Sequence, residues 1–463
     1  MDIIEEIKRK TNNSKDIIYK DLVIGKDKIT LIYSTSTSSN ISINDFILRY
    51  LSENRNNKDA YKYIPNDNVI ELKKTDDITY FIYSGFTIII SGKNILAYEN
   101  KSKTNSDVIR SENEKSLKGP SDSFCENYET NIGMIRRRIK SDDLWYKEVV
   151  VGKYSKTKIS IFYINGIAKE SLVNEIYEKI NKLNIKYAGN TTYILDAISN
   201  TNRSIFPTNL TTERLDFACQ LLMEGRVLLM CENSNEVIIL PCLFLDFFKD
   251  PTDYYEKELN VIASRIIRFS AMIIALVIPA LYISLMTYNI EAIPNKLLIN
   301  FTLQRENVPF STLFEVLVMS FMFQILRESD MRYPGKGSSS ISIVGGLVLG
   351  QAAVEAGIVS PITIIVVGTA SVATLAFSNV ELINSIRWWQ LILILISSVF
   401  GFIGTLFGCL IILAMLVKES SCSIPYFSPF EPFNKLKQKD AIITKKRFRF
   451  NPKSIFIKGD IDD

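Results

Sequence analysis

The chain has 463 residues, 22% of them charged, and a formal net charge of only +4. So small a charge does not favour a nucleic-acid-binding protein. The chain contains no histidine, which argues against zinc sites and histidine-based catalysis. We therefore expect no metal, no cofactor and no nucleic-acid partner, and the length allows about three structural units.

The apolar residues, 47% of the total, are unevenly distributed. Charged residues crowd positions 1–265 and 418–463, and the region between them is mostly apolar. This division predicts a mixed α/β soluble amino-terminal half of two subdomains, followed by an all-α multi-span membrane domain. The expected units are two soluble subdomains, the membrane domain and a basic cytoplasmic tail, over residues 1–123, 124–262, 263–417 and 418–463.

Six cysteines are scattered without CxxC spacing, which favours reduced thiols and a cytoplasmic position for the soluble half. In the first subdomain, β-branched and aromatic residues predict strands over 29–33, 78–83 and 86–90. Residues 101–123 are polar and rich in turn-forming residues, so we expect a flexible connection there. Neither subdomain carries a recognisable catalytic constellation, and both fit a scaffold better than a ligand-binding or docking module.

The second subdomain shows both helical and strand patterns. Gly225 suits the left-handed turn beyond a helix, and apolar spacing indicates a helix with a buried face that includes Leu172 and Ile176. The predicted helices cover 128–139, the region from 172 to 183, and 212–223, and the predicted strands cover 158–164, 227–230 and 237–240.

The apolar region contains several candidate membrane spans. Residues 269–288 lack charge over twenty positions, enough to cross about 30 Å of hydrocarbon. Arg265 and Arg268 precede them and place their start in the cytoplasm. The other apolar stretches are 310–326, 341–377 and 391–417.

The tail sets the expected topology. Between Lys435 and Lys458 it holds nine Lys or Arg against one acidic residue, Asp440, which predicts a cytoplasmic tail. If the last helix runs inward as one span, residues 341–377 must cross once in net. We expect one span plus a short or re-entrant helix, broken near Gly357–Pro361.

The segment that begins near position 344 has two distinct helical faces. Small residues on one face let another helix approach closely, and we interpret them as positions for helix packing or oligomer contact: Gly346, Gly350, Ala353 and Gly357. Gln351 and Glu355 lie on the opposite face and are candidates for a pore or ion path. A carboxyl at membrane depth costs about 2.5–3.5 kcal/mol, so Glu355 either contacts water or ions or is a buried, protonated structural group.

Three further features of the apolar region have predicted roles. Glu315 has the same two interpretations as Glu355, a pore or ion path or a buried structural group, and the pore or ion path is the less favoured one, because a position at the membrane edge would let Glu315 reach the interface. Gly401, Gly404 and Gly408 are interpreted as packing sites rather than hinges. The run Arg387 to Trp389 is typical of an interfacial aromatic belt.

Several motifs together resemble the A subunit of the GerA-type nutrient germinant receptors of bacterial spores, over nearly the whole chain. They are Asn131 to Ile139, Tyr163 to Ala168, Glu224 to Val227, Leu240-Pro241, Asp253 to Tyr255, Arg305 to Pro309, Ile325 to Glu328, Ser342 to Gly346 and Gly350 to Gly357. The chain departs from the family pattern at Leu215, where proline is usual, and this affects only a local turn.

The resemblance implies a nutrient-sensing role in the spore inner membrane, beside a transporter-like B subunit and a lipoprotein C subunit. It also implies that A subunits form a homo-oligomeric, ligand-gated cation-release channel in the lipid bilayer that triggers germination, with the amino-terminal half and the tail on the spore-core side. A secondary transporter subunit and a non-conducting, signal-transmitting scaffold stay open as alternatives. No internal repeat is visible in the sequence, which counts against a transporter, and an enzyme is the least favoured class.

Overall fold

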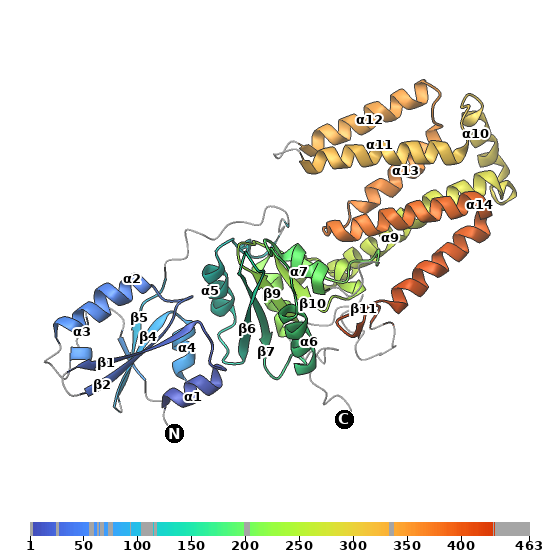
Figure 1. The fold of residues 1–463 in the computed structure, drawn as a ribbon. Coiled ribbons are helices and arrows are strands. Elements are labelled where there is room, and N and C mark those ends of the chain that lie inside the picture. The colour runs from blue at the N-terminus through green and yellow to red at the C-terminus, as the bar shows by residue number, and fades with distance from the viewer. Residues whose placement is uncertain are drawn as a thin grey trace.

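The computed structural model describes residues 3–24, 27–54, 60–62, 64, 69–72, 77–92, 94–102, 114, 118–198, 204–332, 338–428 and 430. Two sheet-containing subdomains follow one another along the chain, and a group of long helices extends from the second of them (Figure 1). Most of the predicted connection at 101–123 and the basic run from Lys435 to Lys458 lie outside the described residues.

The first subdomain is an antiparallel five-stranded sheet in the order β1-β2-β4-β5-β3. Its elements are α1 (Ile3–Lys10), β1 (Ile17–Ile24), β2 (Asp27–Ser34), α2 (Asn40–Ser42), the π-helix η1 (Ile43–Leu48), α3 (Arg49–Glu53), η2 (Ala60–Lys62), β3 (Val69–Glu71), α4 (Ile78–Tyr83), β4 (Phe86–Ser91) and β5 (Asn94–Glu99). The strand predicted over 78–83 is wrong, because α4 occupies these residues. Ile78 and Ile82 lie four residues apart and both are fully buried, so packing overrides their strand propensity.

The second subdomain is a five-stranded antiparallel sheet in the order β6-β7-β9-β10-β8. Its elements are α5 (Tyr128–Arg138), β6 (Leu144–Val151), β7 (Thr157–Ile164), α6 (Glu170–Asn181), α7 (Thr191–Ile198), β8 (Leu210–Thr212), α8 (Leu215–Met223), β9 (Val227–Cys231), β10 (Val237–Leu240), η5 (Phe244–Phe248) and η6 (Pro251–Tyr255). The predicted helices and strands are present, except that Thr212 ends a strand and the helix begins at Leu215.

The two subdomains repeat one topology. In each, the first two strands form a hairpin and the third strand pairs with the fifth at the sheet edge. Gly85 and Gly225 precede the fourth strands and have φ of 87° and 90°, a conformation that favours glycine. The amino-terminal half therefore contains a repeated strand order that the sequence does not reveal.

Helix α5 joins the subdomains. Gly133 lies directly against the backbone carbonyl of Ser36, so a side chain at this position would collide with the first subdomain. Arg136 is fully buried, with its Nε 3.4 Å from Asp16 Oδ2 and its guanidinium 4.3 Å from the centre of the Tyr83 ring. The Arg136 side chain of the second subdomain is therefore enclosed by polar and aromatic side chains of the first.

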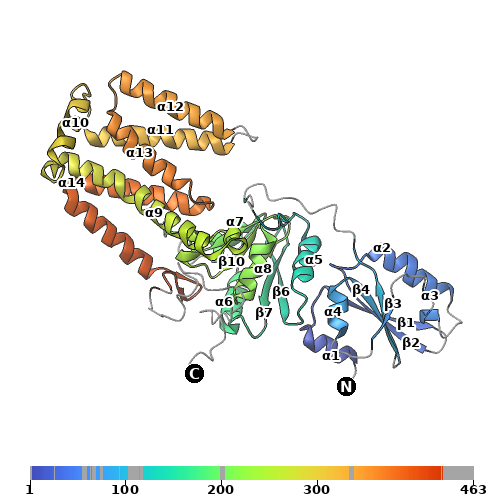
Figure 2. The ribbon, with the colours of Figure 1, turned by 180° about the vertical axis from the view of Figure 1, so that it is seen from behind.

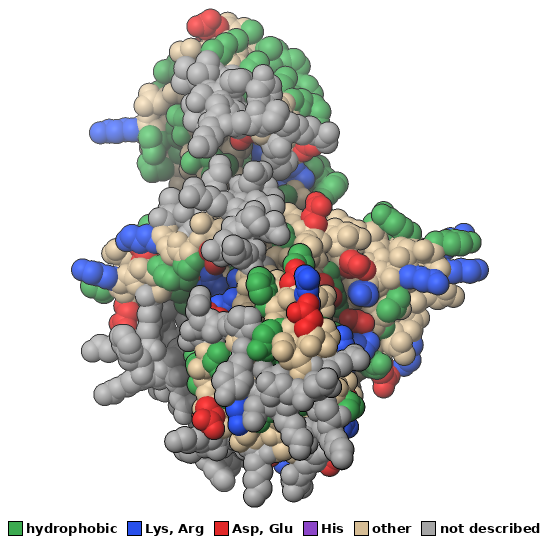
Figure 3. Space-filling model, turned by 90° about the vertical axis from the view of Figure 1, so that its left-hand side faces the viewer, with side chains coloured by type: hydrophobic (Ala, Val, Ile, Leu, Met, Phe, Trp, Pro, Cys, Tyr) green, Lys and Arg blue, Asp and Glu red, His purple; other side chains and the backbone are tan. Residues whose placement is uncertain are grey.

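The carboxy-terminal half is helical. It contains α9 (Glu258–Thr287), η7 (Ile290–Ala292), α10 (Asn295–Arg305), α11 (Thr312–Arg332), α12 (Ser338–Glu355), α13 (Pro361–Thr374) and α14 (Val380–Lys418), then the short hairpin β11 (Ser420–Ser421) and β12 (Ile424–Pro425). Among the described residues, α9 and α14 are long and apolar enough to cross a membrane. Hydrophobic side chains gather on the surface of this half, in the upper part of Figure 3.

The helices run back and forth from the soluble half. Helix α9 leads away from it, α11 returns, and α12 and α13 lie antiparallel (Figures 1 and 2). Helix α12 ends at Glu355 and α13 begins at Pro361, so the expected break near Gly357–Pro361 separates two full helices. Helix α13 has 14 residues and is a shorter apolar helix, as the expected short or re-entrant helix requires, and the number of crossings made by residues 341–377 stays a prediction.

Helix α14 folds back on itself at Gly401. This residue has φ 61° and ψ −144°, which no helix contains. Gly408 lies against Leu393, although fifteen residues of continuous helix would separate them by about 22 Å. Gly401 thus forms the turn and also packs closely against Tyr288, and Gly404 and Gly408 pack against the first arm of α14.

Gly401→Ala should destabilise the helical half, since its backbone conformation is essentially confined to glycine and costs other residues about 1–3 kcal/mol. A Cβ would also lie 3.0 Å from Tyr288. Gly346→Ala is the matched control, because its Cβ would meet Leu326 at an ordinary 3.6 Å. Thermal unfolding of the detergent-solubilised chain measures the stability of both variants. Equal midpoints would show that the turn at position 401 does not require glycine.

Candidate functional site

Helix α12 presents two different faces. Gly346 approaches Leu326 of α11, and Gly350 approaches Ile364 of α13. Gln351 and Glu355 are exposed on the other side. The predicted division of faces therefore holds, and the glycines pack within the chain.

The other two predicted packing residues also contact neighbouring elements of the same chain. Ala353 is half-buried in the apolar cluster that contains Met319 and Val359. Gly357 ends the helix with φ 67°, with the Asn307 carbonyl oxygen 3.2 Å from where its Cβ would be. Contact of any of these small residues with a second copy of the chain stays a prediction.

Glu315 lies in a buried polar cluster where α11, α13 and the end of α10 meet. Its side chain is fully buried, and its Oε2 accepts hydrogen bonds from the Ser360 backbone N (2.9 Å), the Ser360 hydroxyl (2.8 Å) and the Thr363 hydroxyl (2.8 Å). Arg305 Nη2 lies 3.3 Å from Oε1 as an ion pair without hydrogen-bond geometry. Tyr282 extends the cluster to α9 through a 3.1 Å contact with the Thr363 hydroxyl.

This arrangement suits an ionised carboxylate, because every partner is a hydrogen-bond donor or a cation. Ser360 is the residue before the first turn of α13, so Glu315 accepts one of the unpaired N–H groups at that end and lies where the helix dipole favours negative charge. The Glu315 side chain therefore holds the start of α13 against α11 and α10. Its burial fits the structural alternative for Glu315, and a role of this residue in an ion path stays a prediction.

The structure separates the two predicted carboxyls. Glu315 faces the interior of the helical half, whereas Glu355 is exposed on α12. Sequence reasoning missed Arg305, Ser360 and Thr363 as partners of Glu315. The signal for Ser360 was available, because serine followed by proline marks a helix start, but no local pattern pairs it with a residue 45 positions earlier.

The junction between the two halves is built from buried charges and aromatic rings. Asp253 is buried at the start of α9, where Arg268 donates to both its oxygens at 2.8 and 3.0 Å and Arg265 Nε lies 3.4 Å away. Trp389 of α14 stacks on Phe206 at a centroid distance of 5.5 Å. Trp389 is therefore a buried residue of the junction, and the interfacial depth expected for the run Arg387 to Trp389 stays a prediction.

The chain also returns to the second subdomain after α14. The Phe244 backbone N donates to the Tyr426 carbonyl at 3.0 Å, and the Ser421 hydroxyl donates to the Thr208 carbonyl at 2.7 Å. Tyr426 is completely buried in the main core cluster. Both ends of the helical half are thus anchored to one soluble subdomain.

A second buried ion pair, between Arg226 and Asp246, lies next to this junction. Arg226 follows the Gly225 turn and binds both oxygens of Asp246, at 2.6 and 2.7 Å. Burial by itself raises the pKa of Asp246, but Arg226 and Lys249 outweigh it and hold the pKa at about 2. Asp246 also accepts from the Leu243 backbone N at 2.8 Å, so the pair orders the turn that carries η5.

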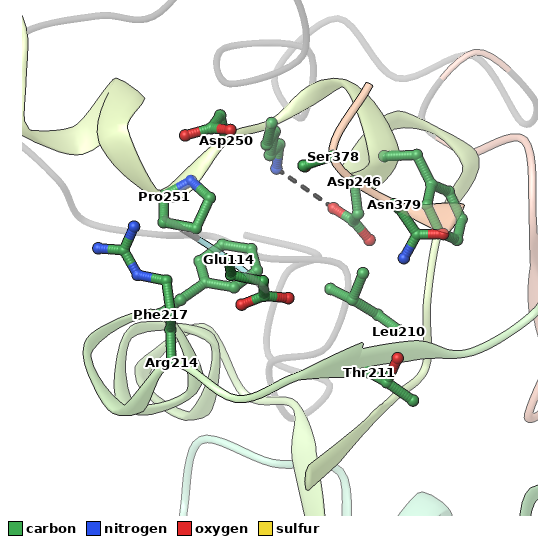
Figure 4. Close-up of a pocket in the computed structure, with 12 residues that line it drawn as sticks. Glu114, Leu210, Thr211, Arg214, Phe217, Asp246, Asp250, Pro251, Ser378 and Asn379 are labelled. Carbon is green, nitrogen blue, oxygen red and sulfur yellow. Dashed lines mark ion pairs between the residues drawn. The ribbon is translucent and has the colours of Figure 1, made fainter. Parts of the chain in front are cut away.

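A small pocket lies beside this pair, lined by β8, α8, η5 and the turn before α14 (Figure 4). Burial raises the pKa of its Glu114 to about 7, and the Thr212 hydroxyl donates to that carboxyl at 2.6 Å. Arg214 in the same wall is occupied by Asp216 at 2.7 Å. These charged groups of the wall are thus paired within the second subdomain and its approach, and no metal-binding group of three or more acidic, cysteine or histidine side chains occurs in the described part of the chain.

Comparison with known proteins identifies the family. The model of the Bacillus/Clostridium GerA spore germination protein family matches residues 5–454. The chain belongs to the GerA family. Spore germination protein KA of Bacillus subtilis is 32% identical over 95% of this chain and 83% of its own length, and spore germination protein A1 of the same organism is 30% identical over 83% of this chain and 79% of its own.

Another relative is known only as an uncharacterised membrane protein of B. subtilis, YfkQ, which is 32% identical over 71% of this chain and 64% of its own length. The crystal structure of the N-terminal domain of the A subunit of the Bacillus megaterium germinant receptor GerK3 is 27% identical, covers 52% of this chain and 94% of that domain, and has a TM-score of 0.40.

Membership of the GerA family, with several relatives named as spore germination proteins, supports a role for this chain in spore germination. Several motifs that carried the resemblance contain buried charged residues, among them Arg136, Arg226 and Asp253. Arg136 contacts the first subdomain, and Asp253 contacts α9.

Proposed function

We propose that this chain is the A subunit of a nutrient germinant receptor in the spore inner membrane, and that copies of it form a ligand-gated channel that releases cations. Its expected partners are the transporter-like B subunit, the lipoprotein C subunit and further copies of itself. Membership of the GerA family supports the receptor role. The arrangement of α12 supports conduction by an oligomer.

The observation that carries the channel proposal is the exposed face of α12. Its glycine face is used inside the chain, while Gln351 and Glu355 are exposed four residues apart on an otherwise apolar helix. A carboxylate facing lipid is costly, and carboxylates in membrane helices face water, a cation or another protein. A ring of α12 helices around a water-filled path would supply such surroundings and attract cations.

The junction gives a route by which a signal could reach α12. A change in the soluble half moves Asp253 and the core around Phe206, which contact α9 and α14. Glu315 then links the helical interior to the α12–α13 turn. Ligand binding elsewhere in the receptor would favour the open arrangement by its higher affinity for that state.

The proposed orientation places the soluble half and the residues after α14 on the spore-core side. Helix α9 begins at the second subdomain and the segment after α14 packs on it, so both ends of the helical half belong on one side of a bilayer. The nine positive charges between Lys435 and Lys458 favour the inner side.

Glu355→Gln is the variant that tests conduction. Potassium release from liposomes that contain the chain, with its B and C partners and nutrient where the chain alone is silent, should fall several-fold, because the path loses its negative charge. The oligomer size measured by light scattering should not change. Glu306→Gln, at an exposed residue beyond α10, is the matched control and should leave release unaltered.

Three results would change the assignment. Equal release by both variants would remove α12 from the ion path. No release under any condition would favour a non-conducting scaffold that transmits the signal. Nutrient uptake without an ion current would favour a transporter subunit, for which the break between α12 and α13 is the structural argument.

A further inference from the structure

One exposed surface of the second subdomain combines lysine and tyrosine side chains. It is formed by the turn between β6 and β7 and by the segment that leads into α7. The Lys153 backbone N donates to the Ile185 carbonyl at 3.0 Å. The Tyr154 backbone N donates to the Lys186 carbonyl, also at 3.0 Å. Two segments that are distant in the sequence are therefore held together as one surface.

This surface carries positive charge without a neighbouring negative charge. Lys153, Lys156 and Lys186 are exposed, and within the described part of the chain none of them forms an ion pair with a carboxylate. Residues 152–158 and 182–193, which contain the turn and the segment before α7, include no Asp or Glu. Unpaired charges of one sign that are grouped in this way attract a partner of the opposite sign.

Three tyrosines lie among these lysines. Tyr154, Tyr187 and Tyr193 are 73%, 59% and 52% exposed. The rings of Tyr187 and Tyr193 meet edge to face with their centroids 5.9 Å apart. Grouped aromatic side chains on a protein surface mark an interaction site. Tyrosine, with an apolar ring and a polar hydroxyl, suits the boundary between lipid headgroups and acyl chains.

The surface is also close to the place where the chain leaves the helical half. Tyr193 belongs to α7, whose Leu195 and Ile198 line a small cavity together with Ser421, just beyond the end of α14. Helix α7 has eight residues and is therefore about 12 Å long. It lies on the same side of the second subdomain as the helical half (Figures 1 and 2). In the proposed arrangement, the tyrosines are thus near the level at which α14 enters the bilayer.

The kind of cation indicates the kind of anion. Arginine, with its planar fork of donors, suits one carboxylate or phosphate in a fixed geometry, whereas the lysine ammonium is a hydrated point charge on a flexible stem. Lysines therefore suit a surface with many anionic groups. We propose that this lysine and tyrosine surface binds the anionic phospholipid headgroups of the inner leaflet and holds the second subdomain against the bilayer. The inference rests on the proposed position of the helical half in a bilayer and not on ion conduction.

Acetylation of Lys156 tests the contact. The full chain is placed in nanodiscs of phosphatidylcholine alone or of phosphatidylcholine with phosphatidylglycerol, and mass spectrometry follows the reaction. Acetylation should be several-fold slower in the anionic discs, and high salt should remove the difference because it screens surface charge. The double variant Lys153→Gln/Lys186→Gln should lower the equilibrium constant for the contact, obtained from the ratio of rates, about 25-fold. Each basic residue at a membrane surface contributes roughly five-fold.

Lys20→Gln/Lys28→Gln is the matched control, because it removes the same charge from exposed positions of the first subdomain. It should leave the slow acetylation of Lys156 unaltered. Equal rates in the two kinds of disc would overturn the lipid surface as the partner, and protection by added polyglutamate would then indicate an acidic protein instead. An unchanged constant in the double variant would overturn the role of the lysines. If alkaline carbonate extracts the chain from vesicles of either composition, the membrane position fails, and both proposals fail with it.

Discussion

Glu315→Ala is expected to cause the largest loss of stability in the helical half, about 3–5 kcal/mol, the usual cost of removing one partner of a buried ion pair. The change leaves Arg305 without its carboxylate and the Ser360 N–H without an acceptor. Thermal unfolding of the detergent-solubilised chain should show a clearly lower midpoint. Helix α13 should become accessible to proteases near its start.

Glu355→Ala is the matched control, because it removes the same carboxylate from an exposed position of the same half. Its midpoint should stay close to that of the unaltered chain. A double variant, Glu315→Gln/Arg305→Gln, should recover part of the loss, since neither charge is then left buried alone. Equal midpoints for Glu315→Ala and Glu355→Ala would show that the cluster does not hold α13 in place.

Arg226→Met should destabilise the second subdomain by a similar amount, about 3–5 kcal/mol. The methionine fills part of the space, but Asp246 keeps a buried charge that only Lys249, 3.5 Å away, still balances. Denaturant unfolding followed by circular dichroism measures the loss. Asp246 belongs to η5, which packs against α9 and against the segment around Tyr426. The junction should therefore loosen as well.

The same pair predicts a direction for acid denaturation. The pKa of Asp246 is about 2 in the folded protein, below its ordinary value of 3.8. The unfolded chain therefore binds this proton first, and the stability that Asp246 contributes is present above about pH 4 and lost as the pH falls towards 2. Arg226→Met should remove much of this dependence.

Arg138→Met separates this effect from a general loss of charge. Arg138 pairs with Asp122 at 2.7 Å, but both side chains are partly exposed, at 28% and 42%. Exposed pairs contribute about 0–1 kcal/mol, so this variant should unfold almost like the unaltered chain. If it lost as much as Arg226→Met, burial would not be the cause.

Local patterns in the sequence were sufficient for most elements. Twenty uncharged residues from Phe269 predict a long apolar helix, and the structure places them in α9. Alternation and turn residues located β7, β9 and β10, and the Gly225 turn was expected from its position after a helix. Such signals depend only on neighbours in the chain, and for that reason they can be recognised without coordinates.

A single glycine changed the path of the last apolar stretch. Residues 391–417 read as one span, but α14 folds back on itself within them. Gly401 turns the chain back with a conformation that no pattern of polarity records. The strand predicted for Ile78 to Tyr83 was wrong for a related reason, since these strand-forming residues pack as a helix.

The sequence by itself determined the family resemblance, the division into a soluble and an apolar half, and the two faces of α12. Only the tertiary structure decided that Glu315 is buried and holds the start of α13, that Trp389 belongs to the junction, and that Arg226 forms an ion pair with Asp246. The physical reason is the separation of the partners. Ion pairs, hydrogen bonds and ring contacts between residues 20 to 180 positions apart leave no periodicity in the chain and exist only once its halves have packed together.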